Sequence, residues 1–139
     1  MSSPLESRLQ DAQLLQTRAF VDGRWQEGER GRFAVTDPAT GAHLADVADV
    51  SVAQVQQAIA AAQAAWPDWR ERSAHERSAL LMRWHALLMQ HQHDLACLMT
   101  AEQGKPLAEA LGEVAYGASF VQWFAEQARR VAGEVLAAP

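Results

Sequence analysis

The sequence predicts an α/β fold in which a short antiparallel β ribbon precedes long helices. Residues 18–48 alternate short apolar runs with turn residues, whereas every signal from Ser51 onward is helical. The last helical stretch is apolar on more than one side, as in a helix that has neighbours on several faces. These helices and a thin ribbon cover one another only partly, so we expect part of a larger α/β protein.

The composition is that of a globular chain with a core. Of the 139 residues, 49% are hydrophobic and 21% are charged. The net charge of -5 argues against nucleic-acid binding, which requires clustered Lys and Arg. No apolar run approaches the roughly 20 residues that span a bilayer, and the start lacks the layout of a signal peptide. We therefore expect a cytoplasmic protein that binds neither nucleic acid nor membrane.

An amino-terminal helical extension is expected over residues 1–17, where Leu5 and Leu9 begin an amphipathic pattern. The β ribbon is expected over residues 18–48. Its first turn is Asp22-Gly23, a strong hairpin signal. Two further strands are expected over 32–36 and 43–47, joined by a turn at 37–41.

Two capping boxes begin the helical region, which is expected over residues 51–132. Ser51 with Gln54 starts a helix that Pro67 should end, giving a range of about 51–65. Ser73 with Glu76 starts a second helix that continues to Gly104. A kink is possible within 91–94, where Asp94 could cap a second segment.

The stretch Gly104-Lys105-Pro106 should stop one helix and start the next. Gly104 suits the left-handed conformation of a helix end, and Pro106 suits the first turn of a helix. The last helix should run from Pro106 to about Ala132, with Gly133 closing it.

The amino-acid sequences of several short blocks resemble the amino-terminal quarter of an aldehyde dehydrogenase. In order, the blocks are FVDGRW, TDPATG, AAWPDW, SAHERSALL, MTAEQGKPLAEA and SFVQWFAEQARR. Within that superfamily, EQGKPLAEA and ASFVQWFAE most resemble NAD(P)-dependent succinate-semialdehyde dehydrogenases. The fold is then an incomplete part of the aldehyde dehydrogenase fold, with residues 18–139 belonging to its domain and residues 133–139 starting an oligomerisation segment.

The resemblance implies an oxidoreductase that uses NAD or NADP. A cysteine thiolate attacks the aldehyde, and the resulting thiohemiacetal gives hydride to the nicotinamide. Water activated by a glutamate base then hydrolyses the thioester. The family's nucleophile and base lie in segments that these residues do not contain, so we assign no catalytic or cofactor-binding residue and expect no activity from this chain alone. For the complete enzyme the resemblance implies succinate semialdehyde as substrate and a homo-oligomer.

Two weaker sites follow from the resemblance. Glu102, with the backbone carbonyls of Val35 and Thr36, would surround a monovalent cation, although a structural carboxylate is the simpler interpretation. Tyr116 and Phe120 would border the substrate entrance tunnel, although aromatic residues at helical spacing commonly belong to a core.

The remaining reactive side chains have ordinary explanations. Cys97 lies in mid-helix without a neighbouring cation, as a buried structural thiol would. His91 and His93 are too close in sequence to share a helical face, so no metal site is assigned. A non-catalytic helical interaction module derived from the family is the alternative function. An open reading frame after Pro139 with the Cys and Glu blocks would favour the enzyme.

Overall fold

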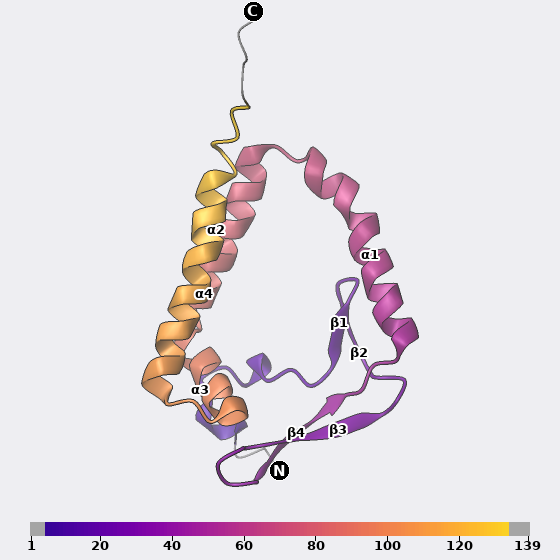
Figure 1. Ribbon diagram of the computed structural model, residues 1–139, viewed down its shortest axis with the longest axis vertical. Helices are drawn as coiled ribbons and strands as arrows, with labels where there is room; N and C mark the ends of the chain where they lie inside the picture. Colours follow the sequence, from indigo (N-terminus) through magenta and orange to yellow (C-terminus); the bar gives the residue numbers. More distant parts are fainter. Residues whose placement is uncertain (1–4, 134–139) are drawn as a thin grey trace, which may run out of the picture.

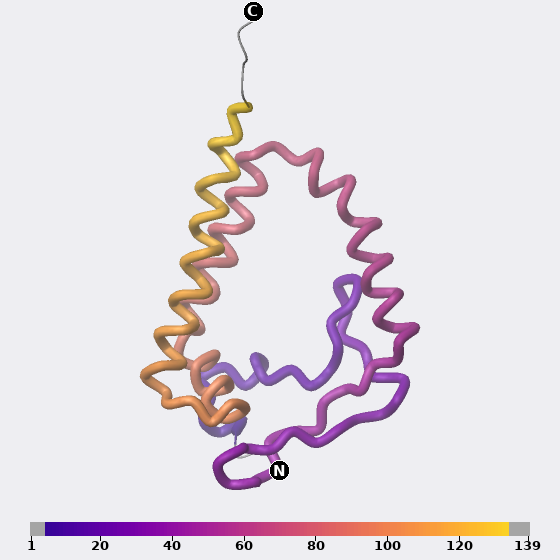
Figure 2. Tube along the Cα trace, viewed as in Figure 1, coloured from indigo at the N-terminus to yellow at the C-terminus, as the bar shows by residue number. Residues whose placement is uncertain are grey.

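The computed structural model describes residues 5–133, which form an open frame (Figure 1). One side is α1 (Val52–Glu71), and the other is the packed pair α2 (Ala74–Gln90) and α4 (Leu107–Gln127). The second of two small sheets and α3 (Gln92–Gln103) lie at the base, and the first sheet rises beside α1. Figure 2 traces the amino-terminal segment along this base, beside α3. The α/β prediction is confirmed.

The amino-terminal segment is not the single amphipathic helix that the spacing predicted. It contains two short 3-10 helices, η1 (Glu6–Arg8) and η2 (Ala12–Leu14), separated by extended backbone at Leu9. Leu5 is buried against Leu44 and Ala101. Burying Leu5 at this site fixes the local path of the chain, and such tertiary contacts outweigh a weak helical preference.

The first hairpin is confirmed. β1 (Ala19–Val21) pairs antiparallel with β2 (Arg24–Gln26) across the Asp22-Gly23 turn. Asp22 and Gly23 have φ values of 51° and 74°, which matches the two positive φ angles of a type I′ turn. Phe20 and Trp25 lie opposite each other, with ring centroids 4.9 Å apart.

The second pair, β3 (Arg32–Thr36) and β4 (His43–Ala48), forms a separate antiparallel sheet, so the expected single ribbon is wrong in this respect. The linker between β2 and β3 pairs with residues before α1 instead. Arg30 N–H donates to the Asp49 carbonyl at 3.0 Å, and Asp49 N–H donates to the Gly31 carbonyl at 2.9 Å. Within the β3–β4 pairing, a register shift beside Val35 and Thr36 accompanies the burial of Leu44.

Helix α1 continues through Pro67 to Glu71, so its predicted end near residue 65 is wrong. Proline removes one backbone hydrogen-bond donor from α1, but a side chain of the next helix stabilises the end of α1. Nη1 of Arg77 donates to the carbonyls of Arg70 and Arg72 at 2.9 and 2.7 Å. These bonds satisfy carbonyls that a helix terminus leaves free, and they stabilise the turn that follows the proline. The capping box of Ser51 and Gln54 is confirmed.

The remaining helices follow the prediction at their starts more closely than at their ends. The Ser73–Glu76 capping box begins α2, and the possible kink is a true break at His91. Gly104 ends α3 in the left-handed conformation, as predicted. Helix α4 ends at Gln127, five residues before the expected Ala132, and Val131 beyond it is 86% exposed. Gly133 therefore does not close the helix. Apart from Gly133, the expected oligomerisation segment lies outside the described residues.

The helices of the frame pack through small side chains. Helix α4 buries Ala110, Val114, Ala118 and Ala125 toward its neighbours. The accessible surface of the chain, 10069 Å², is about 40% above the ~7,100 Å² of a compact monomer of this mass. Large apolar side chains are exposed on α1, α2 and α4. Among residues 5–133, no helix has both the length and the apolar character needed to cross a membrane.

Candidate functional site

The break between α3 and α4 is built around Gly104. Its φ of 73° ends α3, and its N–H donates to the Thr100 carbonyl at 2.9 Å. The next helix begins after Pro106, whose carbonyl accepts from the N–H groups of Glu109 and Ala110, both at 3.0 Å. Lys105 forms an ion pair with Glu113 on the second turn of α4. The break thus sets the direction of α4 relative to α3.

Two of the three residues of the predicted cation site line one pocket. Val35 and Glu102 border a cavity of about 340 Å³ between the amino-terminal segment and the β3–β4 sheet. Thr36 follows Val35 at the register shift but is not among the lining residues. Leu5, Leu15, Phe33, Leu44 and Val47 make most of the wall apolar. Glu102 supplies the one carboxylate among the described lining residues, so the donors fit a monovalent cation only together with backbone carbonyls.

Tyr116 and Phe120 form an exposed aromatic pair. Their ring centroids are 4.8 Å apart with an interplanar angle of 81°, an edge-to-face contact. They are 65% and 47% exposed and lie on the side of α4 opposite its buried alanines. Trp123 and Phe124, at 56% and 60%, extend this surface. The core interpretation of these aromatic residues is therefore wrong for this chain.

Cys97 has the environment of a structural thiol. Burial raises the pKa of Cys97, and the negative charge of Asp94 raises it further. Its Sγ atom lies 3.7 Å from Nδ1 of His93, one helical turn earlier. A thiol held in its protonated form is a poor nucleophile.

Asp94 is the polar residue whose role sequence reasoning missed. It is 3% exposed and does not cap α3. Its two carboxylate oxygens accept from the backbone N–H groups of Gln10 at 3.0 Å and Asp11 at 2.8 Å. These bonds, led by the one from Gln10, lower the pKa of Asp94 despite its burial. The partners lie more than 80 residues away in sequence, so no local signal pointed to them.

We find little sign of a further metal-binding or acid–base site in the described part of the chain. Among residues 5–133, His, Cys, Asp and Glu side chains form no group of three that could hold a metal ion. Glu113 pairs with Lys105 as part of a charged surface near the start of α4.

Comparison with known proteins shows which family this architecture belongs to. Residues 25–139 match the aldehyde dehydrogenase family. A 3-sulfolactaldehyde dehydrogenase of Pseudomonas putida is 51% identical over 132 residues, which cover 94% of this chain and 27% of the relative. The NADP(+) succinate-semialdehyde dehydrogenase of Escherichia coli is 45% identical over 130 residues, with coverages of 93% and 27%.

Solved structures agree with the sequence comparison. The succinate-semialdehyde dehydrogenase of Burkholderia pseudomallei superposes with a TM-score of 0.90 at 49% identity, covering 94% of this chain and 27% of that one. The chain thus spans about a quarter of the length of these relatives, at their amino-terminal end. The resemblance drawn from the EQGKP and SFVQW blocks is confirmed, and this chain belongs to the aldehyde dehydrogenase family.

Proposed function

We propose that this chain forms the amino-terminal part of an NAD(P)-dependent aldehyde dehydrogenase. Its substrate is a short aldehyde with a distal acid group, and succinate semialdehyde is the leading candidate. The supporting observation is its 45–51% identity to the two named relatives over nearly its whole length. By name, one acts on 3-sulfolactaldehyde and the other on succinate semialdehyde. Each substrate combines an aldehyde with an anionic sulfonate or carboxylate.

Within that enzyme the chain acts as a scaffold. The family chemistry requires a reactive thiolate, and the pKa of Cys97 is raised, away from the thiolate form. The nicotinamide cofactor, when bound in the complete enzyme, accepts the hydride. The isolated chain therefore does not oxidise aldehydes, and its contribution is to hold the frame on which the remaining fold is built.

Two parts of the frame have finer roles in this proposal. The exposed pair Tyr116 and Phe120 borders the entrance tunnel for the aldehyde, which is supported by their position on the outer face of α4. Glu102, with the Val35 and Thr36 carbonyls, binds a monovalent cation that ties α3 to β3, which is supported by the pocket that Val35 and Glu102 share. The complete enzyme is a homo-oligomer, as the family resemblance implies, and we assign it to the cytoplasm.

The test is a pair of chimaeras. This chain replaces the matched first quarter of the Escherichia coli succinate-semialdehyde dehydrogenase and, separately, of the Pseudomonas putida 3-sulfolactaldehyde dehydrogenase. We expect each chimaera to keep its host's substrate preference, with kcat/KM within about tenfold of the host. The isolated 139 residues, assayed with succinate semialdehyde and either cofactor, should produce no NADH or NADPH.

Two results would contradict the proposal. Turnover by the isolated chain would show that it carries its own catalytic groups. Folded chimaeras without activity on either substrate would favour the alternative, a helical interaction module that has diverged from the enzymes.

A further inference from the structure

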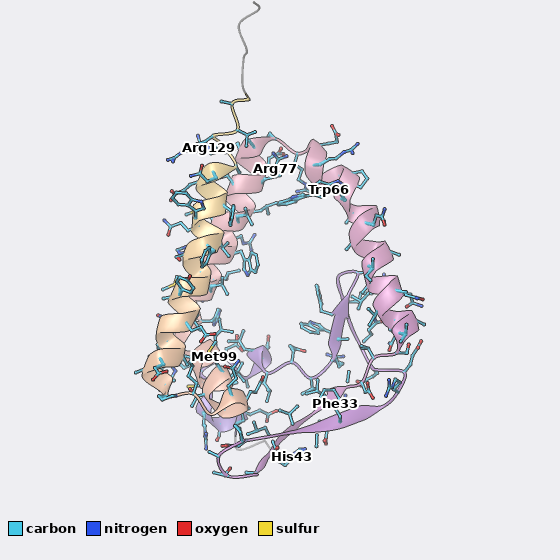
Figure 3. The ribbon with its side chains drawn as sticks, viewed as in Figure 1. Phe33, His43, Trp66, Arg77, Met99 and Arg129 are labelled. Atoms are coloured by element: carbon cyan, nitrogen blue, oxygen red, sulfur yellow. The ribbon has the colours of Figure 1, made fainter. Side chains whose placement is uncertain are left out.

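Helix α1 carries an apolar stripe that residues 5–133 leave largely exposed. Its four members recur at helical spacing and therefore share one face of the helix. Their exposed fractions are 71% for Val52, 46% for Val55, 62% for Ile59 and 56% for Trp66. Figure 3 shows Trp66 projecting from α1 into the interior of the frame.

A groove continues this stripe toward the first hairpin. It has a volume of about 330 Å³ and lies between α1 and β1. Its walls are almost entirely apolar and include Ala19, Val21, Val55, Ala58, Ile59 and Ala62. The stripe and the groove share Val55 and Ile59, so they form one continuous surface, which we call the α1 surface.

We propose that the α1 surface is a preformed docking site for the downstream part of an aldehyde dehydrogenase chain, and that it captures this part even when the two are separate polypeptides. This inference rests on the proposed function and adds a partner and a contact surface to it. The occupant is apolar where it meets Ile59, because the groove offers almost no polar lining.

The first argument for this occupant is the persistence of the frame in longer proteins. The Burkholderia pseudomallei enzyme contains the same arrangement at a TM-score of 0.90, although this chain accounts for only 27% of it. The frame therefore coexists with the remaining residues of such a chain without rearranging. In this chain α1 has β1 as its main packing partner, which leaves its apolar stripe available to those residues.

The second argument is the amount and distribution of exposed apolar surface. The total accessible surface exceeds that of a compact monomer by about 2,900 Å², and exposed large apolar side chains contribute part of this excess. Exposed large apolar side chains lie on α1 and, on the opposite side of the frame, on α2 and the aromatic face of α4 (Figure 1). A twofold dimer of this chain would bury one patch against its own copy and leave the other exposed. One large partner can cover both.

The test is capture in trans. The tagged 139-residue chain is co-expressed with an untagged polypeptide that comprises the Pseudomonas putida 3-sulfolactaldehyde dehydrogenase without its matched first quarter. We expect both polypeptides to be recovered on the tag in equal amounts. Ile59→Glu places a charge in the docking surface, and we expect recovery to fall at least about tenfold. Because Ile59 is 62% exposed, this variant should keep the circular dichroism of the parent chain.

The matched control is Ala64→Glu. Ala64 is exposed on the same helix but points about 150° away from the centre of the stripe, at ~100° per residue, and the substitution adds the same charge. It should leave recovery unchanged.

Three outcomes would overturn the inference. The first is that Ile59→Glu and the parent chain recover the same amount of the untagged polypeptide. The second is that the untagged polypeptide does not appear in soluble form with this chain. The third is that the chain forms a homodimer that Ile59→Glu dissociates. Active chimaeras with no capture in trans would remove the docking inference alone. Capture with inactive chimaeras would remove only the proposed activity.

Discussion

A Cβ atom added to Gly104 would lie 3.1 Å from Cγ of Pro38. The helix break after α3 and the turn after β3, 66 positions apart in sequence, are therefore in close contact. Glycine is required at position 104 for two reasons, since its φ of 73° also lies in the left-handed region. The most recognisable block of the sequence thus joins the helical half of the frame to its β half.

The Gly104→Ala variant should lose about 1–3 kcal/mol of unfolding free energy, because alanine is strained at positive φ and its methyl group presses on Pro38. Urea unfolding followed by circular dichroism measures the loss. Gly41→Ala is the control, since Gly41 has a φ of 72° but no atom near its Cβ position. Gly104→Ala should be the more costly change, and Pro38→Ala in the same chain should recover part of the difference. Equal costs at the two positions would show that the Pro38 contact is unimportant.

The Asp94→Asn variant should unfold more easily by about 1–3 kcal/mol near neutral pH, because the buried carboxylate accepts two backbone N–H bonds. The pKa of Asp94 is lowered from its ordinary value of 3.8, so the stabilisation is complete above that pH and is lost as the pH falls through the folded pKa. Urea unfolding at several pH values should show the variant and parent converging in acid. Asp22→Asn, at an exposed turn, is the control and should leave the pH dependence near that of the parent. A constant gap between Asp94→Asn and parent would contradict this account.

Gln54→Ala should cost about 2–3 kcal/mol, because this buried side chain joins the residue 27–29 loop to the start of α1. Its Oε1 accepts from the N–H groups of Glu29 and Ser51 at 2.9 and 3.0 Å, and its Nε2 donates to the Glu27 carbonyl at 2.9 Å. Thermal unfolding of this variant beside Gln57→Ala, an exposed neighbour on α1, measures the difference. Equal midpoints would mean that water replaces these bonds without loss.

Pro67→Ala should stabilise the chain by about 1–3 kcal/mol, because it restores a backbone donor inside α1 and removes the clash of the proline ring. Helical circular dichroism should not decrease, and the unfolding midpoint should rise. Pro106→Ala is the control, because Pro106 lies at the helix boundary, where the missing donor matters less. A less stable Pro67→Ala chain would show that the proline bend is needed for α1 to reach α2.

Tyr116→Ala should separate stability from function. In the isolated chain the unfolding midpoint should hardly change, because Tyr116 is 65% exposed. In the Escherichia coli chimaera the same change should lower kcat/KM for succinate semialdehyde by about tenfold if the residue borders the entrance tunnel. Phe20→Ala, from the exposed aromatic pair on the first hairpin, is the matched control and should leave kcat/KM unchanged. Equal effects from both variants would remove the tunnel role.

Local patterns were sufficient where the deciding contacts are local. The limits of β3, the Asp22-Gly23 turn, both capping boxes and the left-handed end at Gly104 all followed from a few adjacent residues. The errors arose where a distant group decides. Asp94 holds the backbone of Gln10, 84 positions away, and Arg77 supports the end of α1 from the first turn of the next helix, where no local helix signal points to it.

The candidate site shows the same division. Val35 and Glu102, two of the residues that the resemblance assigned to a cation site, line one cavity. The spacing of Tyr116 and Phe120 suggested a core, but both are exposed. A helical stripe shows which side chains share a face, and it carries no information on which face a partner covers. Here the alanines of α4 take the internal contacts, and its aromatic residues remain outside.

The bond between Asp94 and Gln10 also determines the order in which the chain can assemble. Its partners are 84 positions apart, and at a synthesis rate of roughly 5–20 residues per second several seconds separate their emergence from the ribosome. During that interval the amino-terminal arm lacks the Asp94 carboxylate, and Leu5 can meet Leu44 but not Ala101, which is also made late. Helices α2, α3 and α4 are close in sequence and can pack as they appear. The arm is thus synthesised well before the residues that hold it and is among the last parts to reach its final position.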